Sequence, residues 1–152
     1  MAYIQLKDIR IAGIATAVPK QTINNKDLIA EFGEKRINRF IRTTGVLERR
    51  VASEYQTASD LGVAATEELF KKKGIDKKTI GALVFASHGP DYKRPATAHV
   101  IQKRLELSEQ CACFDISLGC SAFVYGIQIL GGLMQTSDIE KALLIVGDTN
   151  SK

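Results

Sequence analysis

The sequence contains no tryptophan, only two histidines, and no apolar run as long as a membrane span. A helix that crosses a bilayer needs roughly 20 consecutive apolar residues, and glycines and glutamines interrupt the most apolar stretch, residues 121–135. The first residues, MAYIQLKD, lack the pattern of a signal peptide because Arg10 lies within the first apolar stretch. We therefore expect a soluble protein without a membrane partner.

Cysteine is also scarce, and its spacing argues against both a metal site and a disulfide framework. Cys111 and Cys113 are two positions apart, which is not the spacing of zinc ligands, and the only histidines are His88 and His99. Three cysteines form no even set of disulfide pairs. We expect no bound metal and a reducing compartment, the cytoplasm.

The net charge of +4 and a pI near 9.0 suit an acidic partner. The densest basic cluster is formed by residues 71–73 and 77–78. No aromatic side chains interleave with these lysines, as a surface that stacks on bases would require. We interpret the cluster as a solvated helix end and expect no nucleic-acid partner.

Apolar and glycine patterns predict an α/β layered fold with a mainly parallel central sheet, formed by one domain over residues 1–152 without linkers. Asn25 is the expected N-cap of the first helix and Gly33 its end. Proline suits the first turn of a helix, so Pro95 is expected to begin the fourth one. The expected strands are residues 9–15, 80–86, 112–117 and 143–149, and the expected helices are 26–32, 34–42, 57–73, 95–105 and 121–135.

The run FDISLGCSAF, residues 114–123, leads an apolar strand directly into a cysteine at the start of a helix. The first amides of a helix lack intrahelical partners and its dipole is positive there, so this position favours a thiolate. Gly119 would allow the sharp turn, and Cys120 is the candidate nucleophile. The alternative is a buried, inert cysteine. The helix that follows is apolar on nearly all sides and is expected in the core, where Gly126, Gly131 and Gly132 would need close packing.

Several other segments accompany this cysteine in order: the first strand ending at Pro19, TTGVLERR at residues 43–50, the strand 80–86, Arg94 with Pro95, and the strand 143–149. Together they resemble the N-terminal half of a type III β-ketoacyl-[acyl-carrier-protein] synthase, a condensing enzyme of the thiolase fold. The family is about twice as long as this chain. The resemblance therefore implies an incomplete N-terminal thiolase-like domain that is inactive alone.

The resemblance implies an acyltransferase of fatty acid biosynthesis that acts in two stages. Cys120 takes an acyl group from a thioester of coenzyme A or acyl carrier protein and passes it to a carbanion formed by decarboxylation of a malonyl-type thioester. The amide of Cys120 helps to form an oxyanion hole. The family's histidine and asparagine lie in its other half. A homodimer, acyl carrier protein as partner and no cofactor beyond the thioester substrates are also implied.

Three positions depart from the family pattern, and two of them, Arg39 and Arg94, are candidate substrate-binding residues. Arg39 stands where a tryptophan commonly stacks on adenine, and Thr43 replaces a family arginine, which leaves coenzyme A open as acyl donor. Arg94 stands where an apolar residue often limits the acyl pocket of the dimer partner. An unpaired charge is costly to bury, so either Arg94 turns to solvent or the acyl group is not a short alkyl chain.

Two further functions remain open. The same fold serves specialised pathways, such as surface-polysaccharide or quinolone-type precursor formation, and the missing tryptophan raises this option. A non-catalytic dimerisation subunit is the other alternative. Cys120 argues against it, because a silent subunit needs no activated thiol.

Overall fold

The computed structural model describes residues 5–150, which form two compact units. The larger, here the sheet unit, comprises the residues up to 17 and residues 57–148. The smaller, here the small unit, is built from residues 18–56 together with the described residues 149–150. Within the described residues, no helix combines the length and apolar character that crossing a bilayer requires.

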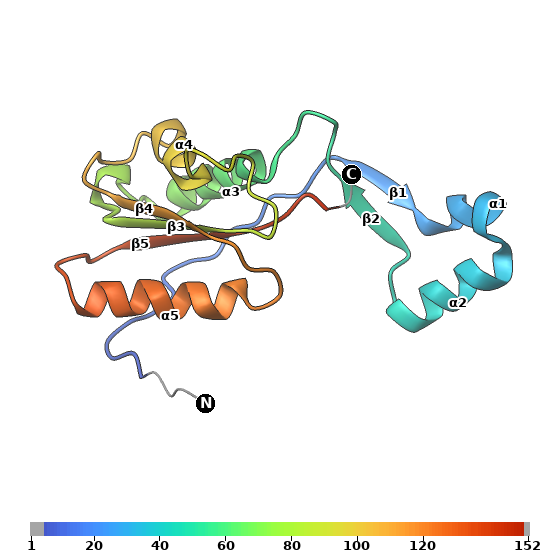
Figure 1. The fold of residues 1–152 in the computed structure, drawn as a ribbon, viewed down its shortest axis with the longest axis horizontal. Helices are drawn as coiled ribbons and strands as arrows, with labels where there is room; N and C mark the ends of the chain where they lie inside the picture. Colours follow the sequence, from blue (N-terminus) through green and yellow to red (C-terminus); the bar gives the residue numbers. More distant parts are fainter. Residues whose placement is uncertain (1–4, 151–152) are drawn as a thin grey trace. The chain divides into compact units, whose positions relative to one another are not determined.

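A three-stranded parallel sheet forms the centre of the sheet unit, as the sequence predicts (Figure 1). Its order is β4-β3-β5, with β3 spanning Ala82–Ala86, β4 Ala112–Ile116 and β5 Ala142–Val146. All five side chains of the central strand β3 are fully buried. Ala86 is level with Ile116 on one side and Val146 on the other. The loops that follow the three strands therefore leave the sheet at the same edge.

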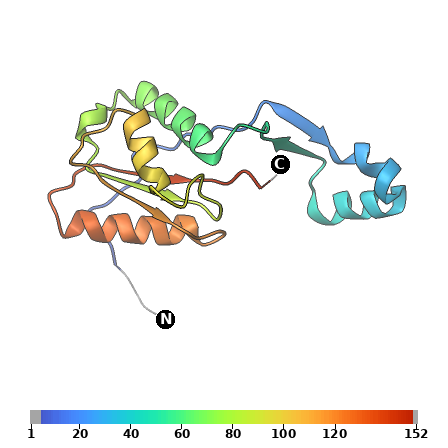
Figure 2. The ribbon, with the colours of Figure 1, turned by 45° about the horizontal axis from the view of Figure 1, so that its top comes forward.

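Helices cover both faces of this sheet (Figures 1 and 2). Helices α3 (Ala58–Lys73) and α4 (Thr97–Arg104) pack on one face, where β3 contributes Leu83 and Phe85 to the larger core. Helix α5 (Ala122–Gln135) packs on the other, against Val84 and its neighbours. Because successive strand residues point to opposite faces, one strand supplies both cores.

Local sequence signals account for the ends of α3. Thr57 and Asp60 form a capping box, in which each side chain accepts a hydrogen bond from the other residue's amide, and Gly74 ends the helix with a φ of 61°. Helix α4 begins two residues later than Pro95, at Thr97. The carboxylate of Asp115 on β4 accepts hydrogen bonds from the Thr97 and Ala98 amides, both at 2.7 Å, and so fixes this start.

Helix α5 is only partly buried, whereas the sequence predicts a helix enclosed by the core. A β-carbon at Gly126 would lie 2.5 Å from Leu144, and one at Gly131 would lie 2.5 Å from Leu6, so these glycines allow close packing. Gly132 faces open space. Position 119 does not require glycine, because its φ is not positive and there is space for a β-carbon. The outer face is exposed because no described residue packs over it; its apolar members are Phe123, Val124, Tyr125 and Ile129.

The small unit contains an antiparallel strand pair that the sequence analysis missed: β1 (Gln21–Asn24) with β2 (Glu48–Val51). Between them lie η1 (Asn25–Leu28), α1 (Ile29–Phe32) and α2 (Glu34–Thr44). The predicted helix over residues 26–32 is thus two short pieces. Its first cap is Asn24, because the Asn25 side chain is buried and donates instead to the Val46 carbonyl at 2.9 Å.

The predicted opening strand over residues 9–15 is wrong in this structure. The segment is extended but joins no strand ladder within the described part of the chain. Helix side chains contact this part of the chain instead: Leu69 of α3 lies against Gly13, and just before the segment the Lys7 carbonyl accepts a hydrogen bond from the Gln135 side chain of α5. The short helix η2 (Lys77–Thr79) completes the described elements.

Candidate active site

Cys120 lies in the turn between β4 and α5. It directly precedes Ser121, the N-cap of α5, so it sits just outside the helix instead of opening it. Two backbone bonds shape the turn: Leu118 donates to the Ile116 carbonyl at 3.1 Å, and Ala122 donates to Gly119 at 2.9 Å. The Cys120 side chain is exposed. The thiol is therefore accessible, unlike that of an inert core cysteine.

The backbone around Cys120 can receive negative charge. The Cys120 amide donates to no acceptor within residues 5–150, since the turn uses those of Leu118 and Ala122. The N-terminal amides of α5 and its dipole favour an anion at the same place. An unpaired amide beside a thiol is the geometry needed to bind the oxyanion of an attacked thioester.

Asp148 joins the loops that follow β3 and β5 at this edge of the sheet. One carboxylate oxygen, Oδ1, accepts hydrogen bonds from the Ser87 hydroxyl at 2.7 Å, the His88 amide at 2.9 Å and the Gly89 amide at 3.1 Å. Ser87 also continues the sheet, because its amide donates to the Ile116 carbonyl at 3.1 Å. The loop after β3 is thereby held beside the end of β4, which leads to Cys120.

The sequence analysis did not single out Ser87 or Asp148. One available signal was that polar residues directly after parallel strands gather at one edge of a sheet. Asp148 follows β5 and Ser87 follows β3, so this rule applies to both. His88 itself is exposed, and its backbone amide is what the carboxylate holds.

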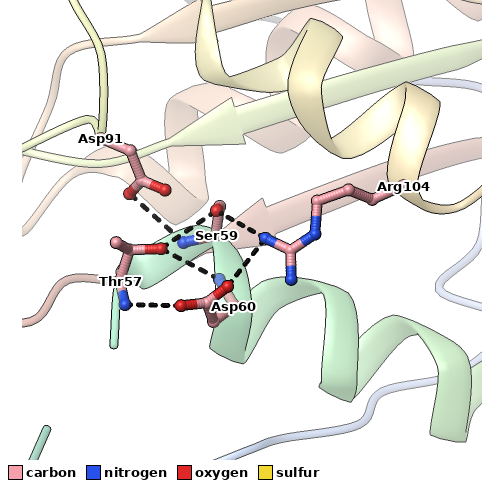
Figure 3. A network of polar contacts seen from close by, with 5 residues as sticks. All are labelled: Thr57, Ser59, Asp60, Asp91 and Arg104. Carbon is pink, nitrogen blue, oxygen red and sulfur yellow. Dashed lines mark hydrogen bonds and ion pairs between the residues drawn. The ribbon is translucent and has the colours of Figure 1, made fainter. Parts of the chain in front are cut away.

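A second polar network anchors the loop after β3 farther along (Figure 3). Asp91 in this loop accepts a hydrogen bond from the Ser59 amide of α3 at 3.4 Å. Arg104 of α4 donates to the Ser59 hydroxyl at 3.1 Å and forms an ion pair with Asp60 at 2.8 Å. Burial opposes the charge of Asp60, but the Thr57 amide and Arg104 outweigh it, so the pKa of Asp60 lies below its ordinary value.

The two candidate substrate-binding arginines belong to different units. Arg94 is exposed next to Pro95 in the sheet unit, and within the described residues it forms no ion pair and no hydrogen bond to Cys120. Arg39 lies on an exposed face of α2 in the small unit. Both arginines remain candidate substrate-binding residues, and neither option for Arg94 is tested by a single chain.

The remaining cysteines lie away from this edge. Cys111 is buried in the core under α3 and α4, and Cys113 packs partly against it. The Cys113 thiol lowers the pKa of Cys111, while Cys111 and burial raise the pKa of Cys113. Among residues 5–150, no group of three histidine, cysteine or acidic side chains is placed to hold a metal ion.

Helices cover both faces of a parallel sheet, and a cysteine lies in the strand-to-helix turn at its edge, so the chain is a layered α/β protein with an accessible candidate nucleophile. The family model of 3-oxoacyl-[acyl-carrier-protein (ACP)] synthase III matches residues 114–152, which include Cys120 and α5. β-Ketoacyl-[acyl-carrier-protein] synthase III of Clostridium beijerinckii is 35% identical over 147 residues, which cover 97% of this chain and 45% of that protein. Its counterpart in Latilactobacillus sakei is 38% identical over 144 residues, covering 94% and 43%.

Solved structures agree with the sequence comparisons. A 3-oxoacyl-(acyl-carrier protein) synthase from Burkholderia xenovorans matches with a TM-score of 0.85 and 35% identity, covering 90% of this chain and 40% of that one. OleA from Xanthomonas campestris matches with a TM-score of 0.85 and 25% identity, covering 97% and 47%. The chain has the thiolase-like α/β fold of these solved structures and is similar to synthase III proteins over nearly its whole length, and it spans somewhat less than half the length of these relatives.

Proposed function

We propose that this chain carries the nucleophile of a condensing acyltransferase. Cys120 would accept an acyl group from a thioester and deliver it to a carbon nucleophile formed by decarboxylation of a malonyl-type thioester. The observation that carries the proposal is the exposed Cys120 thiol in the turn before α5, within the segment that matches the synthase III family. Covalent catalysis divides one difficult condensation into two easier steps.

In the first step, the Cys120 sulfur attacks the carbonyl carbon of the donor thioester, and a C–S bond forms. The carbonyl oxygen becomes an oxyanion, to which the free Cys120 amide can donate. One preorganised donor of this kind contributes roughly 3 kcal/mol to the transition state. The tetrahedral intermediate then expels the donor's sulfur as thiolate, which leaves an acyl-Cys120 thioester.

In the second step, a malonyl-type thioester loses CO2, and the resulting carbanion attacks the acyl-Cys120 carbonyl. A new C–C bond forms and the Cys120 thiolate departs. The resemblance assigns assistance in decarboxylation to a histidine and an asparagine of the family's other half. Asp148 supports the site in our proposal by holding the loop after β3 at the same sheet edge.

The acyl donor, the oligomeric assembly and the cellular compartment are part of the same proposal. Arg39 and Arg94 are the candidate contacts to the acyl donor, which is a thioester of acyl carrier protein or coenzyme A, and a homodimer is the expected assembly. The exposed positions of both arginines support such contacts. Free thiols at all three cysteines support a reducing compartment, the cytoplasm, as the place of action.

Mass spectrometry of the full-length protein after incubation with acyl-coenzyme A and, separately, with acyl-[acyl-carrier-protein] tests the proposal. We expect a mass increase of one acyl group on the peptide that contains Cys120, with its loss in Cys120→Ala. The matched control is Cys113→Ala, which should still be acylated. If neither donor modifies Cys120, the proposal is wrong and the dimerisation-subunit alternative is favoured.

A specialised pathway on the same fold is the second candidate. The observation that favours it is Arg39 on α2 in place of the family's stacking tryptophan. Offering short-chain, long-chain and polar acyl donors in the same assay separates it from primary fatty acid synthesis. Preference for a donor other than a short plain alkyl group would support the specialised pathway.

A further inference from the structure

The carbonyl of Ile116 joins the end of β3 to the turn that holds Cys120. It accepts a hydrogen bond from the Ser87 amide, directly after β3, and a second one from the Leu118 amide, both at 3.1 Å. These two amides occupy the two lone pairs of the oxygen. Cys120 follows Leu118 by two positions. The position of Ser87 therefore helps to fix the first residues of the turn.

Ser87 is itself held by the loop that follows β5, on the other side of β3. The residue is 2% exposed, and its hydroxyl donates to the Asp148 carboxylate at 2.7 Å. The same carboxylate oxygen accepts hydrogen bonds from the amides of His88 at 2.9 Å and Gly89 at 3.1 Å. Two successive amides and a hydroxyl thus form a nest around one anionic oxygen. Hydrogen bonds to a charged acceptor are stronger than those between neutral groups, so Ser87 has little freedom to move.

Contacts on both sides of Cys120 fix the rest of the turn. Before it, the partly buried Leu118 packs against the core on the α5 face of the sheet. After it, the Ala122 amide donates to the Gly119 carbonyl at 2.9 Å. Cys120 lies between these two anchors with an exposed side chain. The backbone on either side of Cys120 therefore sets the place of its sulfur relative to the sheet.

We propose that Ser87 and Asp148 are positioning residues for the nucleophile, which act through the Ile116 carbonyl and hold the Cys120 sulfur in the geometry that attack on a thioester requires. The inference rests on the proposed function and adds two residues to its site. A displacement of about 1 Å in a reacting group can lower a rate by about 100-fold. Supporting residues place a reactive side chain accurately when packing and hydrogen bonds lock them. Ser87 meets both conditions.

The hydrogen bonds distinguish this role from direct participation in the chemistry. Within residues 5–150, the hydrogen bonds found at the Asp148 carboxylate lead to the loop after β3, and none leads to Cys120. A second serine separates the role from general support of the fold. Ser59 is also 2% exposed, but it lies on α3, and its hydroxyl accepts a hydrogen bond from Arg104 of α4 at 3.1 Å. Ser59 is therefore a matched comparison for Ser87.

The test removes the Ser87 hydroxyl in the full-length protein and follows Cys120 in two ways. In Ser87→Ala, we expect kcat for acylation of Cys120 by acyl-coenzyme A or acyl-[acyl-carrier-protein] to fall about fivefold or more. KM for the donor should stay within about twofold, because the contacts to the donor are unchanged. Alkylation of Cys120 by iodoacetamide, which needs no donor, should slow about threefold or more. The reason is that a displaced sulfur moves away from the α5 amides that favour its anion.

Asp148 variants test whether the two residues act together. Asp148→Ala should give the same losses as Ser87→Ala, and the double variant should give no larger ones, because residues of one network are not additive. Asp148→Asn keeps an acceptor oxygen and should recover most of the acylation and alkylation rates. The matched control Ser59→Ala removes an equally buried hydroxyl and should react like the parent in both assays.

Four outcomes overturn the positioning role. Unchanged rates in Ser87→Ala would leave the pair without effect on Cys120, and a change confined to KM would assign it to donor binding. Additive losses would separate the two residues, and an equal effect of Ser59→Ala would reduce the role to stability. Asp148 is exposed, so Asp148→Ala still decides the question if thermal unfolding shows that Ser87→Ala does not fold. Slower alkylation in the variants, with no acylation of the parent by either donor, would support the positioning role and refute the proposed function.

Discussion

Gly126→Ala and Gly132→Ala make the same chemical change in the same helix, but the structure predicts opposite effects. A β-carbon at Gly126 would lie 2.5 Å and 2.9 Å from the two methyl carbons of Leu144 on β5, which is too close for carbon atoms. A β-carbon at Gly132 would have no neighbour within 4 Å. The pair thus separates the packing of α5 on the sheet from its helix propensity.

The magnitudes follow from two competing contributions. Alanine stabilises a helix interior by about 1 kcal/mol relative to glycine, and this gain applies to both variants. Overpacking at Gly126 costs about 1–3 kcal/mol in addition. We therefore expect Gly126→Ala to be less stable than Gly132→Ala by about 2 kcal/mol. In a protein of this size, that difference corresponds to roughly 4–8 °C in Tm.

Urea and thermal unfolding measure this difference, and acylation of Cys120 shows whether a shifted α5 also disturbs the turn at its start. Leu144→Ala combined with Gly126→Ala is the matched rescue, because the shortened side chain makes room for the new methyl group. A double-mutant cycle gives the coupling between the two positions. Equal stabilities of Gly126→Ala and Gly132→Ala, or no coupling to Leu144, would refute the close packing of α5 on β5.

Three further predictions concern the sheet edge and its supports. Asp148→Ala removes an acceptor of three hydrogen bonds and should lower the free energy of unfolding by roughly 1–2 kcal/mol, with faster amide exchange in the loop after β3. Asp148→Asn keeps one acceptor oxygen, so it should retain part of the protection from amide exchange. Since the folded-state pKa of Asp60 is lowered, its stabilising contribution is present above the ordinary value of 3.8 and is lost as the pH falls through the lower folded value. The stability of Asp60→Asn should therefore depend less on pH in this acidic range than the stability of the parent protein. An unchanged pH profile of acid unfolding would contradict the network of Asp60 with Thr57 and Arg104. Iodoacetamide should modify the exposed Cys120 before the buried Cys111, and the reverse order, read by peptide mass spectrometry, would contradict the exposure of the turn.

Helix α3 and the turn around Cys120 could be predicted because local interactions specify them. The capping box of Thr57 and Asp60 and the left-handed Gly74 mark both ends of α3 within the sequence itself. Likewise, an apolar strand followed by a turn and a long apolar segment predicts β4, the Cys120 turn and α5 in order. In both cases the interacting residues are a few positions apart, so the local sequence pattern is enough to predict the element.

The strand pairs, by contrast, depend on partners far along the chain. Residues 9–15 and the strand β1 are both short and extended, yet within residues 5–150 only β1 pairs with another strand, β2, which aligns Glu48 with Asn24. Nothing local to either segment distinguishes the two cases. Asp148 likewise acquires its role from amides about 60 positions earlier, at His88 and Gly89.

The sequence by itself determined the layered α/β class, the long helices and the place of the candidate nucleophile between a strand and a helix, because hydrophobic period, caps and turns act over a few residues. Only the tertiary structure decided which strands pair, which face of α5 is buried, and that Cys120 lies exposed just outside the helix. The physical reason is that hydrogen bonds between strands, side-chain packing and ion pairing depend on distances in space. Residues far apart in the chain meet only when the whole chain folds.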